Sequence, residues 1–111
     1  MSQTYQAFGL SILSSIELPE LFLKEVASTE KPDVEILFGE TPETLENPQK
    51  EGVAYQANLN EYLLDLEGIG RYWVTNGNKI IIQPKEEATD DDIRLFLLGS
   101  ALGALLHQRE T

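Results

Sequence analysis

Residues 68–84, "GIGRYWVTNGNKIIIQP", contain the strongest local structural signal in the chain. Two runs rich in β-branched and aromatic residues flank the pair Asn76-Gly77, which readily adopts the positive φ angles of a type I′ turn. Pro84 has no backbone N–H to donate to a neighbouring strand, so it ends the second run. The segment therefore predicts a β-hairpin within a largely antiparallel sheet.

Four further strands are predicted before this hairpin. The first shows period-two alternation that places Phe8, Leu10 and Ile12, joined by Gln6, on one face of a single half-buried strand. Between the second and third candidates lie the polar residues 39–52, which contain two prolines and predict a surface loop. The four candidates are residues 5–13, 32–39, 53–60 and 61–68.

A terminal helix is predicted for "DDDIRLFLLGSALGALLHQRE", residues 90–110. Thr89 and Asp92 have the spacing of a capping box, which satisfies backbone amides that a helix start leaves unpaired. Acidic side chains in the first turn and basic side chains in the last turn both interact favourably with the helix dipole, and each such interaction contributes roughly 0.3 to 1 kcal/mol. The whole chain, residues 1–111, is therefore predicted to be one α+β domain: a mostly antiparallel sheet of about five to six short strands with the C-terminal helix packed on it.

Composition excludes several classes of function. The formal net charge is −11 and the eight basic residues are scattered singly, so the chain lacks the basic cluster needed to bind nucleic acid or an anionic membrane surface. There is no cysteine, and the single histidine, His107, has no partner for thiolate or imidazole metal chemistry. We therefore expect no cofactor, no metal, no catalytic residue, no nucleic-acid partner and no membrane partner, and we expect the protein to be cytoplasmic.

The predicted helix carries an unusual number of small residues on one side. Each interior glycine costs about 1 kcal/mol relative to alanine, and a close approach of another backbone is the usual compensation. Three arrangements provide that approach: the helix lies on its own sheet, packs against its twin in a homodimer, or meets a further domain. The residues predicted to contact such a partner are Phe96, Gly99, Ser100, Leu102, Gly103 and Leu106.

A second recognition surface is predicted around the aromatic residues of the hairpin. Tyr72 and Trp73 are adjacent in a strand, so they face opposite sides of the sheet, and one of them belongs to the core. Together with Arg71, the other offers an aromatic and cationic contact surface of the kind found in protein interfaces.

Three segments, "AFGLSILSSIELPEL", "GIGRYWVTNGNKIIIQP" and "DIRLFLLGSALGALLHQR", together span nearly the whole chain. In this order they resemble the N-terminal region of HPr-kinase-like proteins, in which a β-rich lead-in precedes a P-loop nucleotide-binding core. In such proteins the segment that matches "LLHQR" continues into a glycine, a strand and a phosphate-binding loop. Here Glu110 and Thr111 follow instead, and the chain contains no G-x-x-x-x-G-K-[ST] motif. The resemblance therefore implies a fold and carries over no catalytic residue.

Two functional hypotheses follow from these observations. The first is a non-catalytic protein-interaction or self-association module related to that N-terminal domain. The second is part of an ATP-dependent kinase-like enzyme whose P-loop domain is on another segment, in which case the helix would meet that domain. The expected partners are accordingly a second copy of the chain or a P-loop kinase-like domain.

Overall fold

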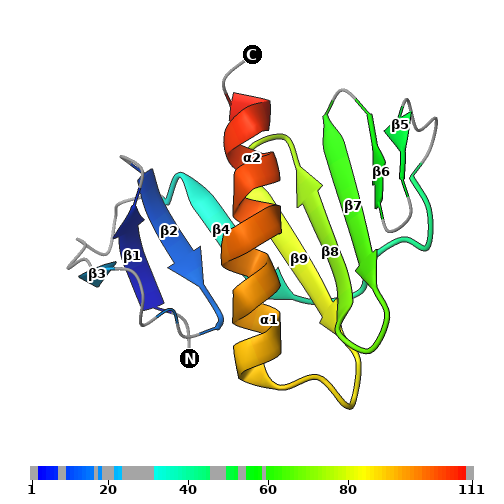
Figure 1. Cartoon of the computed structure of the whole chain (residues 1–111). Helices are drawn as coiled ribbons and strands as arrows, with labels where there is room; N and C mark the ends of the chain where they lie inside the picture. Colours follow the sequence, from blue (N-terminus) through cyan, green and yellow to red (C-terminus); the bar gives the residue numbers. More distant parts are fainter. Residues whose placement is uncertain are drawn as a thin grey trace.

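The computed structural model describes residues 3–7, 10–16, 18, 22–23, 32–45, 50–52, 55–58 and 60–109. Within these residues the chain forms one mixed sheet with a helix lying across one face (Figure 1). The strands are β1 (Gln3–Ala7), β2 (Leu10–Ser14), β3 (Phe22–Leu23), β4 (Val34–Phe38), β5 (Lys50–Glu51), β6 (Tyr55–Ala57), β7 (Glu61–Leu66), β8 (Gly70–Thr75) and β9 (Lys79–Pro84). The helix consists of α1 (Asp90–Phe96), the π-helical turn η1 (Leu97–Ala101) and α2 (Leu102–Arg109).

The sheet corrects the predicted architecture. The strand order is β3-β1-β2-β4-β9-β8-β7-β6-β5, and β4 pairs in parallel with both β2 and β9. The α+β character is confirmed, but a mostly antiparallel sheet of five to six strands is wrong. In the described residues the sheet is mixed and has seven strands of three or more residues, with a two-residue strand at each edge. Parallel partners lie far apart in the chain, so no local turn signal reveals them.

The N-terminal segment is also corrected, because residues 5–13 do not form a single strand. β1 and β2 pair antiparallel, with Tyr5 opposite Ile12 and Ala7 opposite Leu10. Tyr5 and Ile12 are therefore on the same, buried face, while Gln6 is exposed. Because β1 and β2 are antiparallel, Tyr5, at an odd position, and Ile12, at an even position, face the same side of the sheet. An alternation continued without a break over the whole segment could not indicate this change.

The predicted hairpin is confirmed. β8 and β9 pair antiparallel from Gly70 opposite Pro84 to Thr75 opposite Lys79. Asn76 has φ of 53° and Gly77 has φ of 66°, as a type I′ turn requires. The Gly77 amide donates a 2.7 Å hydrogen bond to Gln108 Oε1, and Gln108 Nε2 donates to the Val74 carbonyl at 3.3 Å. The hairpin turn therefore holds the end of the helix.

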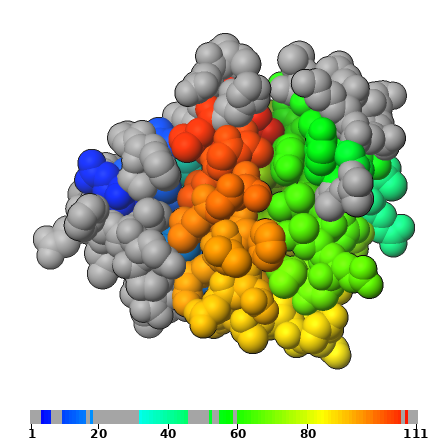
Figure 2. Space-filling view, viewed as in Figure 1, coloured from blue at the N-terminus to red at the C-terminus, as the bar shows by residue number. Residues whose placement is uncertain are grey.

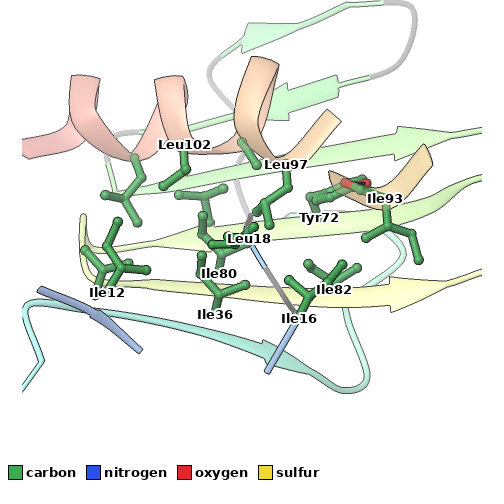
Figure 3. Close-up of a cluster of buried hydrophobic side chains, with 14 of the residues drawn as sticks. Ile12, Ile16, Leu18, Ile36, Tyr72, Ile80, Ile82, Ile93, Leu97 and Leu102 are labelled. Atoms are coloured by element: carbon green, nitrogen blue, oxygen red, sulfur yellow. Dashed lines mark hydrogen bonds between the residues drawn. The ribbon is translucent and has the colours of Figure 1, made fainter. Parts of the chain in front are cut away.

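The core lies between the helix and one face of the sheet. Figure 3 shows Ile93, Leu97 and Leu102 directed from the helix toward isoleucines of β4 and β9. Burial of each such side chain contributes about 1.5 to 3 kcal/mol. The fully or nearly fully buried members are Tyr5, Ile12, Ile16, Leu18, Val34, Ile36, Leu64, Tyr72, Val74, Ile80, Ile82, Ile93, Leu97, Ala101, Leu102 and Leu105.

The helix begins as predicted and contains one irregular turn. Thr89 accepts a hydrogen bond from the Asp92 amide, and Asp92 accepts one from the Thr89 amide, which completes the capping box. In η1 the Leu102 amide donates to the Leu97 carbonyl, five residues back instead of four. This wider turn lets the consecutive residues Ala101 and Leu102 both reach the core.

Candidate functional site

The side of the helix that faces away from the sheet is apolar and open. We define the outer row as Leu95, Gly99 and Gly103, which lie four residues apart and are all exposed. Leu95 is 65 % exposed, the most exposed large hydrophobic side chain among the described residues. Figure 2 shows the helix, in orange and red, at the front of the molecule between the strands on either side.

The two glycines of the outer row are not explained by packing within the chain. A Cβ atom added at Gly99 or Gly103 would have none of the described atoms within 4 Å beyond the helix's own turns. The helix does lie on its own sheet, but it does so through the opposite side, at Leu97, Ala101 and Leu105. The close approach that was expected to compensate for these glycines is therefore absent from the described part of the chain.

The outer row lies in a stretch without formal charge. From residue 95 to residue 106 the sequence contains no Asp, Glu, Lys or Arg. Arg94, at the edge of this stretch, forms an ion pair with Asp91 one turn earlier. A solvent-facing helix surface normally carries charged and polar side chains, so an uncharged one with an exposed leucine is typical of an interaction surface.

The other predicted contact residues flank this row or lie beneath it. Phe96, Ser100 and Leu106 are half-buried, and Phe96 packs against the core. Leu102 is only 2 % exposed and belongs to the core, so its side chain does not reach the outer surface. The helical spacing of the sequence did not predict that Leu95 would be exposed, although the absence of charged residues from the following stretch was visible in the sequence.

The structure separates the three residues of the second predicted surface. Tyr72 is fully buried beneath the helix, where its hydroxyl donates a 2.8 Å hydrogen bond to the Ile93 carbonyl. Arg71 and Trp73 lie on the opposite face of the sheet and are half-buried. Trp73 Nε1 donates to Glu61 at 2.9 Å, and Arg71 Nη1 contacts the Pro42 carbonyl at 3.5 Å. Only Arg71 and Trp73 therefore share a surface.

Residues 39–45 fold onto that opposite face, which a purely exposed loop would not do. The Thr41 amide and hydroxyl both donate to Gln83 of β9 at 2.8 Å, and the Leu45 amide donates to Gln56 of β6 at 2.7 Å. Leu45 is 4 % exposed. Residues 39–45 nevertheless form a surface loop, as predicted, because they contain no helix or strand and only Leu45 among them is buried. The surface-loop prediction fails at Lys50–Glu51, which form β5.

The titration of Tyr72 reflects its burial. Desolvation, with a smaller contribution from the negative charge of Asp92, raises the pKa of Tyr72 to about 12. Burial, followed by the neighbouring Tyr55, also raises the pKa of Tyr62; the Tyr55 and Tyr62 rings stack with centroids 5.6 Å apart. Both shifts favour the neutral phenol and point to packing.

Among the described residues, no group of three His, Asp or Glu side chains is placed to hold a metal ion. In the same part of the chain, no helix has the length and apolar character required to cross a bilayer.

Comparison of the chain with protein-family models, with curated proteins and with solved structures returns no match.

Proposed function

We propose that this protein is a non-catalytic protein-interaction module and that the outer row, Leu95, Gly99 and Gly103, is the surface that contacts the partner. The observation that carries this proposal is the exposure of Leu95 at 65 % in a helical stretch without charge. An isolated exposed leucine needs no explanation, but here it adjoins two glycines at which an added Cβ would meet none of the described atoms within 4 Å beyond the helix's own turns, which leaves room for another backbone.

The way in which the helix is held supports the same proposal. Its first turn is attached to β8 by the Tyr72 hydroxyl, and its last turn is attached to the hairpin by Gln108. The row is thus presented on a rigid element fixed at both ends. A preordered surface loses little conformational entropy when a partner binds.

The proposed relationship to the N-terminal domain of HPr-kinase-like proteins rests on the resembling segments. In the described residues these segments include β2, the β8–β9 hairpin and the helix, which together supply most of the core. If the relationship is correct, a P-loop domain on another segment is the alternative partner, and the outer row would then be an interdomain contact in an ATP-dependent enzyme.

Site-specific photo-crosslinking tests the proposal. The full chain carries a benzoylphenylalanine at Leu95, or at Phe38 as the matched control, and is irradiated in the cells that naturally express it. Phe38 is the other exposed large hydrophobic residue of the described chain, at 45 %, and lies at the end of β4.

We expect covalent protein adducts from position 95 and none from position 38, with the partner identified by mass spectrometry. A P-loop protein as the adduct would favour the kinase-like alternative. If position 95 gives no adduct with any protein, including another copy of the chain, the interaction surface is elsewhere and the proposal is wrong.

A further inference from the structure

We propose that Asn76 is a site of covalent modification, at which the side-chain amide is lost through a cyclic imide formed with the backbone nitrogen of Gly77. The contact between Gly77 and Gln108 holds this reaction back while the last turn of the helix lies on the hairpin. The reaction proceeds when that turn detaches. This inference goes beyond the proposed function, because none of the three residues belongs to the outer row.

The sequence gives Asn76 the highest intrinsic reactivity among the asparagines. A side chain on the residue that follows an asparagine obstructs the approach of that residue's backbone nitrogen to the asparagine amide carbon, whereas a glycine has no Cβ to do so. Asn76 is the one asparagine of the sequence that precedes a glycine. A residue with a side chain follows each of the others, which are Asn47, Asn58, Asn60 and Asn78.

The reaction balances with water as its one co-reactant. The Gly77 nitrogen loses its proton to hydroxide and attacks Cγ of Asn76, so the N–Cγ bond forms and the Cγ–Nδ2 bond breaks. The side-chain nitrogen leaves as ammonia, which takes up the released proton. Water then opens the five-membered imide. Cleavage of the new N–Cγ bond gives aspartate, and cleavage of the original peptide bond gives isoaspartate, in which the main chain runs through the side-chain carbons.

The conformation of the turn opposes ring closure. Asn76 has φ of 53°, in the left-handed region where ψ is about +30 to +60°. With ψ in this range, the Asn76 Cβ lies almost opposite the Gly77 nitrogen about the Cα–C bond. The imide ring requires these two atoms to be nearly eclipsed. The turn must therefore open before the Gly77 nitrogen reaches Cγ.

Solvent reaches only one of the two reacting residues. Asn76 is exposed, so ammonia has a path into solvent, but Gly77 is buried and its amide donates a 2.7 Å hydrogen bond to Gln108 Oε1. That hydrogen bond must break before hydroxide can remove the proton. Gln108 Nε2 also donates to the Val74 carbonyl at 3.3 Å, so one side chain of α2 holds the turn that lies beside it (Figure 1). Gln108 therefore controls access to the Gly77 nitrogen.

The isoaspartate product prevents the contact from forming again. It inserts an additional main-chain carbon into a turn whose central residues are Asn76 and Gly77. The pairing of Thr75 with Lys79 fixes the span of this turn, so a longer main chain displaces the Gly77 amide from Gln108. The modification thus converts a reversible detachment of the helix end into a lasting one.

Incubation of the purified full chain at mildly alkaline pH tests the site. Peptide mass spectrometry reads the loss of each asparagine amide, and chromatography separates isoaspartate from aspartate. We expect slow loss from Asn76 in the folded protein, much faster loss in guanidinium chloride, and isoaspartate among the products. Asn78 is the internal control, because it is exposed in the same hairpin but precedes Lys79. Its amide should be lost more slowly than that of Asn76 in guanidinium chloride.

Two substitutions separate the Gln108 contact from overall stability. Gln108→Ala removes the acceptor of the Gly77 amide, so we expect loss of the Asn76 amide at least about fivefold faster in the folded protein. Hydrogen exchange at Gly77 should accelerate by the same factor, because both reactions pass through the open turn. Tyr72→Phe weakens the attachment of the helix at its other end but leaves the Gly77 contact in place, so it should not change the rate.

Three results would overturn the inference. Equal rates in the folded and unfolded wild type would mean that the fold gives no protection. Aspartate without isoaspartate would exclude the cyclic imide. Equal acceleration by Tyr72→Phe and Gln108→Ala would mean that the reaction follows general unfolding. If circular dichroism shows that Gln108→Ala does not fold, Gln108→Glu replaces it, with a smaller acceleration expected because an acceptor remains.

Discussion

Tyr72 lies in the centre of β8, and its hydroxyl donates a 2.8 Å hydrogen bond to the carbonyl oxygen of Ile93 in α1. The same carbonyl also accepts the amide of Leu97 at the junction with the π-helical turn. One buried side chain thus attaches the sheet to the helix where the helical geometry changes. This bond fixes the rotation of the helix about its axis and therefore the direction in which Leu95 projects.

Replacement of Tyr72 by Phe tests the importance of this attachment. The Ile93 carbonyl keeps its intrahelical partner, so we expect a loss of about 0.5 to 1.5 kcal/mol in the free energy of unfolding. For a domain of this size that corresponds to a fall of several degrees in Tm. Thermal unfolding at pH 7 measures it, and an unchanged Tm would contradict a structural role for the bond.

The raised pKa of Tyr72 also predicts a loss of stability at alkaline pH. An unfolded tyrosine ionises near pH 10, whereas the folded side chain remains neutral up to about 12. The stabilisation is therefore fully present below pH 10 and is lost as the pH rises from 10 to 12, by an amount on the order of 2 to 3 kcal/mol. Urea unfolding across this range should show a steeper fall for the wild type than for Tyr72→Phe.

Substitution of glycine by alanine is expected to have opposite effects on stability at Gly70 and at Gly103. Gly70 has φ of +143°, and an added Cβ would lie 2.5 Å from the Gln83 carbonyl oxygen and 2.8 Å from the Pro84 Cα. Since both atoms belong to the backbone of β9, we expect Gly70→Ala to destabilise the fold by about 2 kcal/mol or more.

At Gly103 the added methyl group meets none of the described atoms within 4 Å beyond the helix's own turns. Because alanine has the higher helix propensity, Gly103→Ala should stabilise the dilute protein by about 0.5 to 1 kcal/mol. Chemical denaturation of both variants at low micromolar concentration provides the comparison. A destabilised Gly103→Ala would show that the chain itself approaches this position.

The last turn of the helix depends on Gln108. Gln108→Ala leaves the buried Gly77 amide without the 2.7 Å acceptor, so we expect a cost of about 1 to 3 kcal/mol. Amide hydrogen exchange at Gly77 should then become faster. Gln108→Glu keeps an acceptor for that amide but loses the donor to Val74, so its effect should be intermediate. Equal protection of Gly77 in all three proteins would argue against this contact.

Local signals in the sequence were sufficient where the structure is local. Asn76-Gly77 specified its own turn, and Thr89 with Asp92 specified the helix start, because each depends on backbone geometry within a few residues. The parallel pairing of β4 with β2 and β9 was missed, as was the burial of Leu45. Each depends on a partner far along the chain, such as Gln56 for the Leu45 amide.

The candidate site shows the same division. The sequence itself shows the stretch without charged residues between Arg94 and His107, and the glycines within it. These features indicated that the helix has more apolar surface than one contact requires. Which side of the helix would remain open was decided only by the tertiary structure. The π-helical turn and the contact of Tyr72 with Ile93 set the rotation of the helix, so Leu97, Ala101 and Leu105 fill the core and the outer row faces solvent. Helical periodicity determines which residues share a face, but only the packing partner determines which face is buried.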